Sequence, residues 1–567
     1  MTSDHAALYN ALASRDPRFD GVFFVGVTST GIYCRPICTA RTPRASNCRF
    51  FDSAAAAEKA SFRPCLRCRP ELAPGRAPVD DAQRIAALVA NRIEEGLLDD
   101  GSSLEKIAAH FGWSSRQIRR IVRRELGVSP MELVLTRRLL LAKQLLTETE
   151  LPMGEIAFAS GFSSVRRFND AFTGRYGMPP TRLRKAAGRT AGSGARGDAR
   201  SGGALSVAAL DVTASTRTAG PPNPLRDAAT IDTLTLQLSY RAPFDWAGIL
   251  RFLAARAVKG VEAVDGTAYL RTVRLGGRAG WIRVHDEPEK HALLMELDRP
   301  LTPALPVLLG RLRNLFDLSA RPDVIAARLE HDELLGAAVS RNPGLRVPGA
   351  FDGFELAVRA VLGQQITVKG ASTLAGRFAA AFGDALETPH ASLTHLSPRA
   401  ERVVEAGVDE ITALGIVGAR ARSIIELARE VTSGRLKLEA GADADATIEQ
   451  LVAIPGIGQW TAHYIAMRAM RWPDAFPKED VVLRKRLGGV TAARADELSQ
   501  PWRPWRSYAT LHLWQMDPAP DAAASRQSAA GGVAGRQPTS QVVAQPRRAA
   551  TTSLPSLARV SSSSSGV

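Results

Sequence analysis

Four of the five cysteines in this chain lie in two closely spaced pairs. Cys34 and Cys38 form one pair with three residues between them, and Cys65 and Cys68 form the other with two. Each short spacing brings two sulfurs within reach of one metal ion, and four thiolates are a donor set typical of tetrahedral zinc. The sequence therefore predicts one zinc ion held by these four residues. On spacing alone, such a closed site is expected to be structural.

Basic side chains crowd the predicted metal site. A zinc ion with four thiolates carries a net negative charge, which nearby cations offset. Arginines also bind phosphate, so the same side chains suit a surface that faces nucleic acid. The arginines concerned are Arg35, Arg41, Arg44, Arg49, Arg63, Arg67 and Arg69. The remaining cysteine, Cys48, is expected to be a small core residue.

A second candidate site combines two glycines with a carboxylate further along the chain. Gly456 and Gly458 lie in a short connection between two predicted helices, where backbone amides can approach a phosphate without obstruction by side chains. Asp480 follows, and its neighbour Glu479 faces another direction if the segment is helical. A glycine pair between helices is weak evidence by itself. A lone aspartate is more often a helix cap or a surface charge.

Composition limits the class of protein. The chain has 567 residues and a net charge of +16, which indicates several domains and a nucleic-acid partner. No apolar run reaches membrane-spanning length, and the first residues lack the pattern of a secretory signal. All five cysteines lie at or before Cys68, which favours a reducing cytoplasm and excludes a cysteine nucleophile further along. We therefore expect a cytoplasmic DNA-binding protein with no membrane partner.

The elements after the cysteine pairs begin with two predicted helix-turn-helix units. Helices are expected over 104–111 and 115–126, and again over 153–159 and 164–176, with a long helix over 131–148 between the units. Long polar side chains near the start of each second helix are positioned to reach base edges. These side chains are Arg116, Gln117 and Arg120 in the first unit and Arg166 and Arg167 in the second. A basic helical bundle without sequence recognition is the alternative.

The sequence pattern of the rest of the chain changes twice. Alternating strands are expected over 234–240, 266–275, 280–285 and 291–297, with a helix over 246–257. From 314 to about 517 the pattern is helical. The stretches 186–229 and 518–567 are rich in small and polar residues and are expected to be a flexible linker and a disordered tail.

The cysteine region resembles a known family. The stretches from Thr30 to Cys38 and from Phe62 to Cys68 resemble the N-terminal domain of the Ada DNA-repair and response proteins. The resemblance implies that Cys34 accepts a methyl group from a DNA methylphosphotriester while zinc holds all four sulfurs. It also implies that Thr30, Arg41 and Arg63 contact DNA. Methylation removes one negative charge beside DNA, so DNA affinity is expected to rise.

Two further resemblances cover the rest of the chain. The segment from Phe168 to Pro179 resembles the signature of AraC-type regulators, which carry two helix-turn-helix units. The stretch from Arg241 to Trp246 and the segment from Ile454 to Ala462 resemble AlkA-type DNA glycosylases of the helix-hairpin-helix superfamily. In that family the domain over 230–313 is largely scaffold.

The glycosylase resemblance implies roles for individual residues. Asp480 is the expected catalytic carboxylate, and a buried carboxylate can stabilise oxocarbenium charge or activate water. Electron-rich rings attract a cationic N-alkylated purine once it has left the stack. The hairpin is also expected to bind a monovalent cation when DNA is present. The rings are those of Trp460, Tyr464 and Trp514, and the expected DNA contacts are Gln364, Gln365, Gly456 and Gly458, with Gln365 at the family's wedge position.

The sequence thus predicts a multidomain α+β protein with two activities. It would accept methyl groups, act as a methylation-switched transcriptional activator with RNA polymerase as partner, and excise 3-methyladenine-type bases from double-stranded DNA, as a monomer. Two alternatives remain: a regulator with an inactive glycosylase, and a repair enzyme whose N-terminal domains serve only as DNA anchors. The expected domains are 1–76 (small zinc-bound α/β), 79–185 (all-α double helix-turn-helix), 186–229 (linker), 230–313 (antiparallel-sheet α+β), 314–517 (mostly α helix-hairpin-helix glycosylase) and 518–567 (tail).

Overall fold

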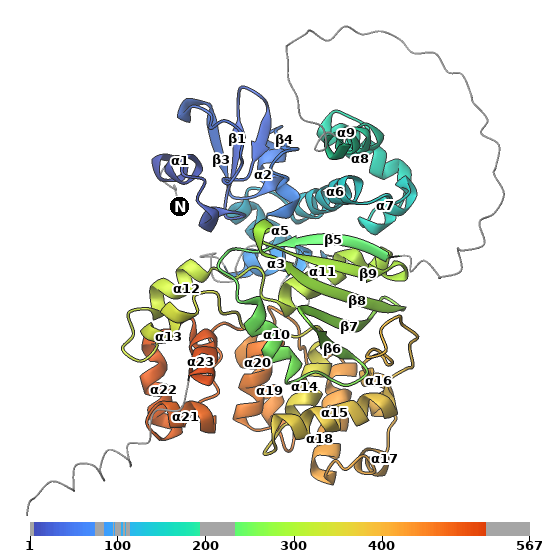
Figure 1. Cartoon of the computed structure of the whole chain (residues 1–567), viewed down its shortest axis with the longest axis vertical. Coiled ribbons are helices and arrows are strands. Elements are labelled where there is room, and N and C mark those ends of the chain that lie inside the picture. The colour runs from blue at the N-terminus through green and yellow to red at the C-terminus, as the bar shows by residue number, and fades with distance from the viewer. Residues whose placement is uncertain are drawn as a thin grey trace, which may run out of the picture. The chain divides into compact units, whose positions relative to one another are not determined.

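A computed structural model describes residues 5–73, 84–192 and 233–516 of the chain, except 95, 97–103, 106–107 and 109–113 (Figure 1). The expected tail, most of the expected linker and most of the helix expected over 104–111 lie outside the described residues. Among the described residues, no helix combines the length and apolar character needed to cross a membrane.

The N-terminal part is built on a four-stranded sheet in the order β3-β1-β2-β4. The strands are β1 (Phe24–Val27), β2 (Ile32–Cys34), β3 (Cys48–Phe51) and β4 (Arg63–Pro64). β1 pairs antiparallel with β2 and β3, whereas β2 and β4 run parallel, with Tyr33 opposite Pro64. The parallel pair therefore ends with Cys34 on one strand and Cys65 directly after the other.

Helices α1 (His5–Ala13) and α2 (Ala54–Lys59) complete the N-terminal part. Ser53 caps α2 by accepting a hydrogen bond from the amide of Ala56. Glu58 of α2 is buried, and its carboxylate accepts hydrogen bonds from the hydroxyls of Tyr33 at 2.8 Å and Thr136 at 3.2 Å. Because Thr136 belongs to the following helical part, this carboxylate joins the two parts.

The described helices of the next part follow the predicted pattern closely. The two recognition helices begin at serine caps and end at glycines with positive φ, Gly127 and Gly177, where a left-handed residue closes the last turn. The long joining helix was predicted over 131–148 and begins one residue earlier. The last helix continues beyond Lys185 into the stretch expected to be a linker. The helices are α3 (Arg84–Glu94), α5 (Ser115–Leu126), α6 (Pro130–Glu148), α7 (Met153–Ala159), α8 (Val165–Tyr176) and α9 (Pro180–Gly192).

A five-stranded antiparallel sheet follows, in the order β5-β9-β8-β7-β6. Four of its strands lie where alternation predicted them. The edge strand β6 was not predicted, because only four residues with acidic ends give too short an alternating pattern. The elements are β5 (Thr233–Ser239), α10 (Trp246–Ala254), β6 (Glu262–Asp265), β7 (Ala268–Leu275), β8 (Arg278–Glu287) and β9 (Ala292–Asp298).

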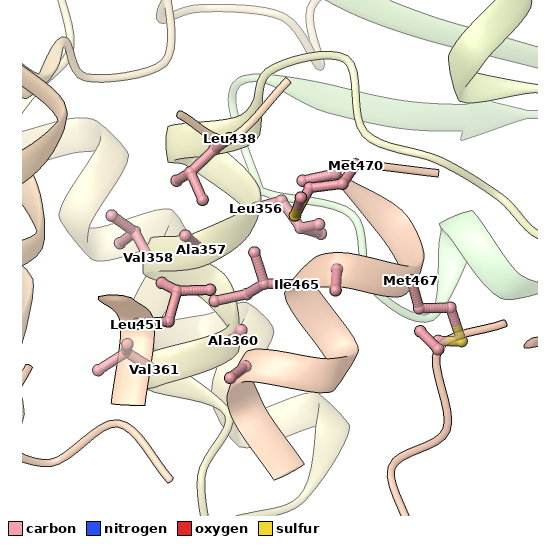
Figure 2. Close-up of a cluster of buried hydrophobic side chains, with 14 of the residues drawn as sticks. Leu356, Ala357, Val358, Ala360, Val361, Leu438, Leu451, Ile465, Met467 and Met470 are labelled. Atoms are coloured by element: carbon pink, nitrogen blue, oxygen red, sulfur yellow. The ribbon is translucent and has the colours of Figure 1, made fainter. Parts of the chain in front are cut away.

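The C-terminal part is helical and packs around one apolar core. Figure 2 shows side chains of α14, α19 and α20 gathered in this core, among them Val361, Leu451 and Ile465, which are fully buried. The core fixes the connection between α19 and α20, where the glycine hairpin lies. The helices are α11 (Leu305–Leu315), α12 (Pro322–Leu329), α13 (Gly336–Arg341), α14 (Gly353–Leu362), α15 (Val368–Phe382), α16 (Ala400–Val404), α17 (Val408–Thr412), α18 (Gly418–Thr432), α19 (Ala444–Ala453), α20 (Gln459–Arg468), α21 (Val481–Arg486), α22 (Ala492–Ser499) and α23 (Arg506–Gln515).

Candidate functional sites

The four paired cysteines meet at one end of the N-terminal sheet. Their sulfurs all lie within 4.8 Å of one another. Cys34, Cys38 and Cys65 are buried, and Cys68 is partly exposed. The parallel pairing of β2 and β4 causes this arrangement, because it brings the ends of the two strands together. The fifth cysteine, Cys48, is buried in the same small apolar core but is not one of the four clustered sulfurs, and it donates to the carbonyl of Arg44 at 3.4 Å.

The chemistry of this cluster fits a thiophilic cation. Hydrogen bonds with the neighbouring cysteine sulfurs raise the pKa of Cys34 well above its ordinary value, because one thiolate disfavours ionisation of the next. A divalent cation among the sulfurs removes that penalty. Backbone amides of Arg35 and Arg67 point at the sulfurs of Cys68 and Cys65 at 3.3 and 3.4 Å, which supports thiolates there.

The arginines around the cluster divide into two groups. Arg35 is buried and paired with Asp20, with its Nε 2.8 Å from a carboxylate oxygen, so this guanidinium is not presented to a phosphate. Arg41, Arg63 and the predicted contact Thr30 are exposed. The amide of Arg63 donates to the carbonyl of Gly31 at 2.8 Å, so the turn that carries Thr30 lies beside Arg63. The surface beside Cys34 is therefore polar and basic.

The predicted recognition side chains are exposed on α5 and α8. Gln117 also has a structural role that the sequence reading missed. Its side-chain oxygen accepts hydrogen bonds from the amide and hydroxyl of Ser114 at 2.9 and 2.8 Å, which completes a capping box at the start of α5. A serine followed three residues later by glutamine was the available signal.

The predicted glycosylase residues line one cavity of about 730 Å³. Asp480, Trp460, Tyr464 and Trp514 all contribute side chains to it, from α20, α23 and the start of α21. The rings of Trp460 and Tyr464 are nearly parallel with centroids 5.3 Å apart, and Tyr464 and Trp514 are 6.3 Å apart. Glu479 is not among the lining residues.

Asp480 is held by three hydrogen bonds. It is the N-cap of α21, and Oδ1 accepts from the amide of Leu483 at 2.8 Å. The indole N–H of Trp460 donates to Oδ2 at 2.8 Å, and that of Trp514 donates to Oδ1 at 3.2 Å. The aspartate is thus both a helix cap and a member of the cavity wall. The two indoles orient its carboxylate as well as lining the cavity.

The cavity also contains cations that sequence reasoning missed. Arg256 and Arg359 line it, and Arg468 donates to the Tyr464 hydroxyl at 2.8 Å. Burial opposes ionisation of Tyr464, but Arg468, Arg256 and Arg359 outweigh it and lower the pKa of Tyr464 to about 8. Phe252 and Arg256 reach the cavity from α10 and the residues after it, beside α20, so the sheet part also contributes side chains to this site (Figure 1). That this part is largely scaffold stays a prediction.

The glycine hairpin is fixed from outside by side chains. Gly456 has φ of +89°, and a Cβ there would lie 2.4 Å from Ser423 Oγ, so glycine is required. Gly458 is the N-cap of α20. Gln364 donates to the Gly456 carbonyl at 2.9 Å and to Thr461 Oγ1 at 3.0 Å, so its amide supports the hairpin. Contact of Gln364 with DNA stays a prediction.

The chain matches four known domain families in order. Residues 7–71 match the metal binding domain of Ada, 107–186 a helix-turn-helix domain, 235–352 the AlkA N-terminal domain, and 358–503 the HhH-GPD superfamily of base excision DNA repair proteins. A probable bifunctional transcriptional activator/DNA repair enzyme AlkA of Mycobacterium tuberculosis (strain ATCC 25618 / H37Rv) is 40% identical over 521 residues, which cover 91% of this chain and 97% of that relative. The chain belongs to this bifunctional AlkA family.

Separate relatives match the glycosylase half and the cysteine-containing domain of this AlkA-family chain. The DNA-3-methyladenine glycosylase 2 of Escherichia coli (strain K12) is 36% identical over 277 residues, covering 49% of this chain and 95% of the relative. The bifunctional transcriptional activator/DNA repair enzyme Ada of the same organism is 46% identical over 65 residues, covering 12% of this chain and 18% of the relative. The predicted fold class is confirmed: an Ada zinc domain with its cysteine cluster, a helix-turn-helix domain, a sheet domain and a helix-hairpin-helix glycosylase fold.

Proposed function

We propose that this protein is a bifunctional DNA-alkylation-response protein of the cytoplasm. It transfers a methyl group from a DNA methylphosphotriester to Cys34, activates transcription in its methylated form, and excises N-alkylated bases of the 3-methyladenine type. The observation that carries the proposal is the presence in one chain of a four-sulfur cluster and of a carboxylate in an aromatic cavity.

Methyl transfer depends on the cysteine cluster. Cys34, Cys38, Cys65 and Cys68 would hold zinc, which when bound keeps coordinated sulfur ionised at neutral pH. Cys34 Sγ then attacks the methyl carbon, so that an S–C bond forms and the O–CH₃ bond of the phosphotriester breaks. The electron pair of that bond stays on the phosphate oxygen and restores the phosphodiester charge. The protein keeps the methyl group, so each molecule reacts once.

Methylation changes the charge that the cluster presents to DNA. A thioether is neutral, so the sulfur ligand set loses one negative charge. Repulsion of the phosphates then falls while the exposed Arg41 and Arg63 continue to attract them. We expect tighter DNA binding after methylation, with Thr30 as a further polar contact at the same surface.

Sequence recognition would come from α5 and α8. Arg116, Gln117 and Arg120 on one helix, and Arg166 and Arg167 on the other, are exposed donors suited to base edges and phosphates in the major groove. Because one chain carries both units, a monomer can occupy two adjacent groove segments. Bound near a promoter, it would recruit RNA polymerase.

Base excision would use the cavity. A flipped N-alkylated base enters between the rings of Trp460, Tyr464 and Trp514, and Asp480 lies at the cavity wall. The carboxylate stabilises positive charge on the sugar as the N-glycosidic bond breaks, and it accepts a proton from the attacking water. Normal purines are poor leaving groups, so the cavity can accept many bases and the reaction still selects the alkylated ones.

The glycine hairpin and the loop before α15 would bind DNA. Backbone amides near Gly456 and Gly458 would approach a phosphate, and a monovalent cation would bind at the hairpin when DNA is present. Gln365 is exposed and has φ of +54°, a left-handed conformation that is strained for a residue with a side chain. This strain is consistent with Gln365 as the wedge that fills the gap left by the flipped base.

One substitution and one mass measurement test the two activities separately. Asp480→Asn should abolish release of 3-methyladenine from methylated duplex DNA while DNA binding persists. Peptide mass mapping after exposure to methylated DNA should find one methyl group on Cys34. Release by Asp480→Asn at the wild-type rate would remove the glycosylase assignment, and label on another residue would remove the Cys34 assignment.

The chief alternative is a transcriptional regulator with an inactive glycosylase domain. The carboxylate of Asp480 argues against it, because this side chain lies in the cavity wall and both indole N–H groups hold it there. A wild-type protein that binds promoter DNA but releases no base would favour this alternative.

A further inference from the structure

Positive charge is concentrated around the hydroxyl of Tyr464. Arg468 donates to this hydroxyl at 2.8 Å and is itself held by the carbonyls of Pro348 and Gly349 at 2.7 and 2.9 Å. Arg256 and Arg359 line the same cavity. Three guanidinium groups, from α20, α14 and the segment after α10, therefore surround one phenol.

These arginines are fixed in place. The guanidinium of Arg256 stacks over the ring of Phe252 at 3.8 Å from its centroid. The side chain of Arg359 is only 15% exposed, and its guanidinium lies 4.0 Å from a carboxylate oxygen of Glu262. Asp480 is the acidic group in the described lining of the cavity, whereas Arg251, Arg256 and Arg359 are its basic groups. The cavity therefore carries a surplus of positive charge.

A positively charged cavity stabilises a base that departs as an anion more than a base that departs as a neutral molecule. A cationic N-alkylated purine takes the bonding electrons and departs as a neutral molecule. An uncharged modified purine takes the same electrons and departs as an anion unless a proton reaches it. Cations around the phenol stabilise both that anion and the phenolate that remains after proton donation.

The electrostatics of Tyr464 match a proton donor. Burial raises its pKa, but Arg468, Arg256 and Arg359 together lower the pKa to about 8. Asp480, at the start of α21, is linked to the neighbouring indoles rather than to the phenol, and α23 contributes Trp514 and Gln515, which do not titrate. The hydroxyl is thus protonated at neutral pH and close to its pKa, where a general acid is most effective.

We infer that Tyr464 donates a proton to the departing base when that base is an uncharged modified purine, a role that rests on the proposed glycosylase function. The C1′–N bond breaks and its electron pair goes to the base. The Tyr464 O–H proton is transferred to a ring nitrogen of the base, which leaves a phenolate beside Arg468. Water adds to C1′ and gives its proton to Asp480. Solvent then returns a proton to Tyr464 and removes one from Asp480.

The test compares an uncharged base with a cationic one in the full-length protein. One duplex carries 1,N6-ethenoadenine, which is uncharged and has no N–H group that titrates in the alkaline range. The other carries 3-methyladenine, which is cationic. Single-turnover release of each base is measured from neutral to alkaline pH, and release of 3-methyladenine serves as the internal reference.

We expect release of ethenoadenine to fall about tenfold per pH unit above pH about 8, as Tyr464 ionises. Tyr464→Phe should lower ethenoadenine release, relative to 3-methyladenine release, by about 10²-fold and should remove this alkaline limb. Arg256→Gln should move the limb to higher pH, an effect that a purely structural role would not produce. Tyr9→Phe, far from the cavity, is the matched control.

Three results would overturn the inference. They are equal losses for the two bases in Tyr464→Phe, an alkaline limb that persists in that variant, and wild-type release of 3-methyladenine with no ethenoadenine release at any pH. Failure of the proposed glycosylase function would give a different result, because the wild-type protein would then release neither base.

Discussion

The indole N–H of Trp460 offers the sharpest single test of how the carboxylate is held. Trp460→Phe keeps an aromatic ring against Tyr464 but removes the donor that lies 2.8 Å from Asp480 Oδ2. The other carboxylate oxygen keeps its bonds from Leu483 and Trp514. The substitution therefore frees one oxygen of Asp480 while leaving the cavity lined by aromatic rings.

The expected fall in kcat follows from the kind of hydrogen bond that is lost. A hydrogen bond to a charged group contributes about 1.5–3 kcal/mol. Because two of three donors to Asp480 remain, the lower end applies, and about 1.4 kcal/mol corresponds to a factor of ten in rate. We expect kcat for base release to fall about tenfold or somewhat more, while KM changes little because the stacking surface is retained.

The assay is single-turnover release of 3-methyladenine from methylated duplex DNA, with DNA affinity measured in parallel. Trp514→Phe removes the longer bond to Asp480 and should have a smaller effect. Because both indoles hold one carboxylate, the two effects should not be additive in the double variant. Trp472→Phe, which alters a ring stacked on His463 outside the cavity lining, is the matched control.

An unchanged kcat in Trp460→Phe would show that the carboxylate of Asp480 does not depend on this donor. A rise in KM alone would also contradict it, since that result assigns Trp460 to base binding only.

Three further predictions concern other parts of the chain. Burial raises the pKa of Glu58 to about 7 against the opposing effects of Tyr33, Arg175 and Thr136. The contribution of Glu58 to the free energy of unfolding is therefore most favourable below the unfolded pKa of about 4.3 and is lost as pH rises through 7. The free energy of unfolding of wild type minus that of Glu58→Gln should therefore fall by up to about 3 kcal/mol between these pH values in urea titrations; a flat difference would contradict the assignment. Gly456→Ala should lower the melting temperature and weaken DNA binding, because its Cβ meets Ser423 and φ is positive, and it should lower the melting temperature more than Gly458→Ala, whose Cβ meets open space. Treatment with a zinc chelator should abolish methyl uptake but leave base release intact, and loss of both would show that the metal supports the whole chain.

The sequence predicted the metal cluster well because short spacings restrict where sulfurs can go. Cys34 and Cys38 share one turn of chain, as do Cys65 and Cys68. What spacing could not reveal is the parallel pairing of β2 and β4, which joins the two pairs. The helices over 115–126, 131–148, 153–159 and 164–176 were predicted nearly to the residue because their caps and apolar faces are local signals.

The cavity was predicted only in part, and the reason is sequence distance. Trp460, Tyr464 and Asp480 lie within one segment whose motif is recognisable. Arg256 and Arg359 enter the cavity from other elements, and an arginine after an amphipathic helix gives no local signal of its position. Tertiary packing alone determines that these cations meet the phenol of Tyr464.

The hairpin shows the same limit at a smaller scale. The need for glycine at Gly456 follows from Ser423, on another helix, and the support from Gln364 comes from a loop about ninety residues away. Gly456 and Gln364 were each noted for their own motif, whereas Ser423 carried no signal in the sequence. Their hydrogen bonds to one another depend on the fold.

The most direct measurement of the central claim uses one sample of full-length protein and methylated duplex DNA. The released bases are quantified, and the mass of the recovered protein is determined from the same tube. We expect free 3-methyladenine together with protein that carries one added methyl group on Cys34. Protein of unchanged mass and DNA that has lost no modified base would contradict it.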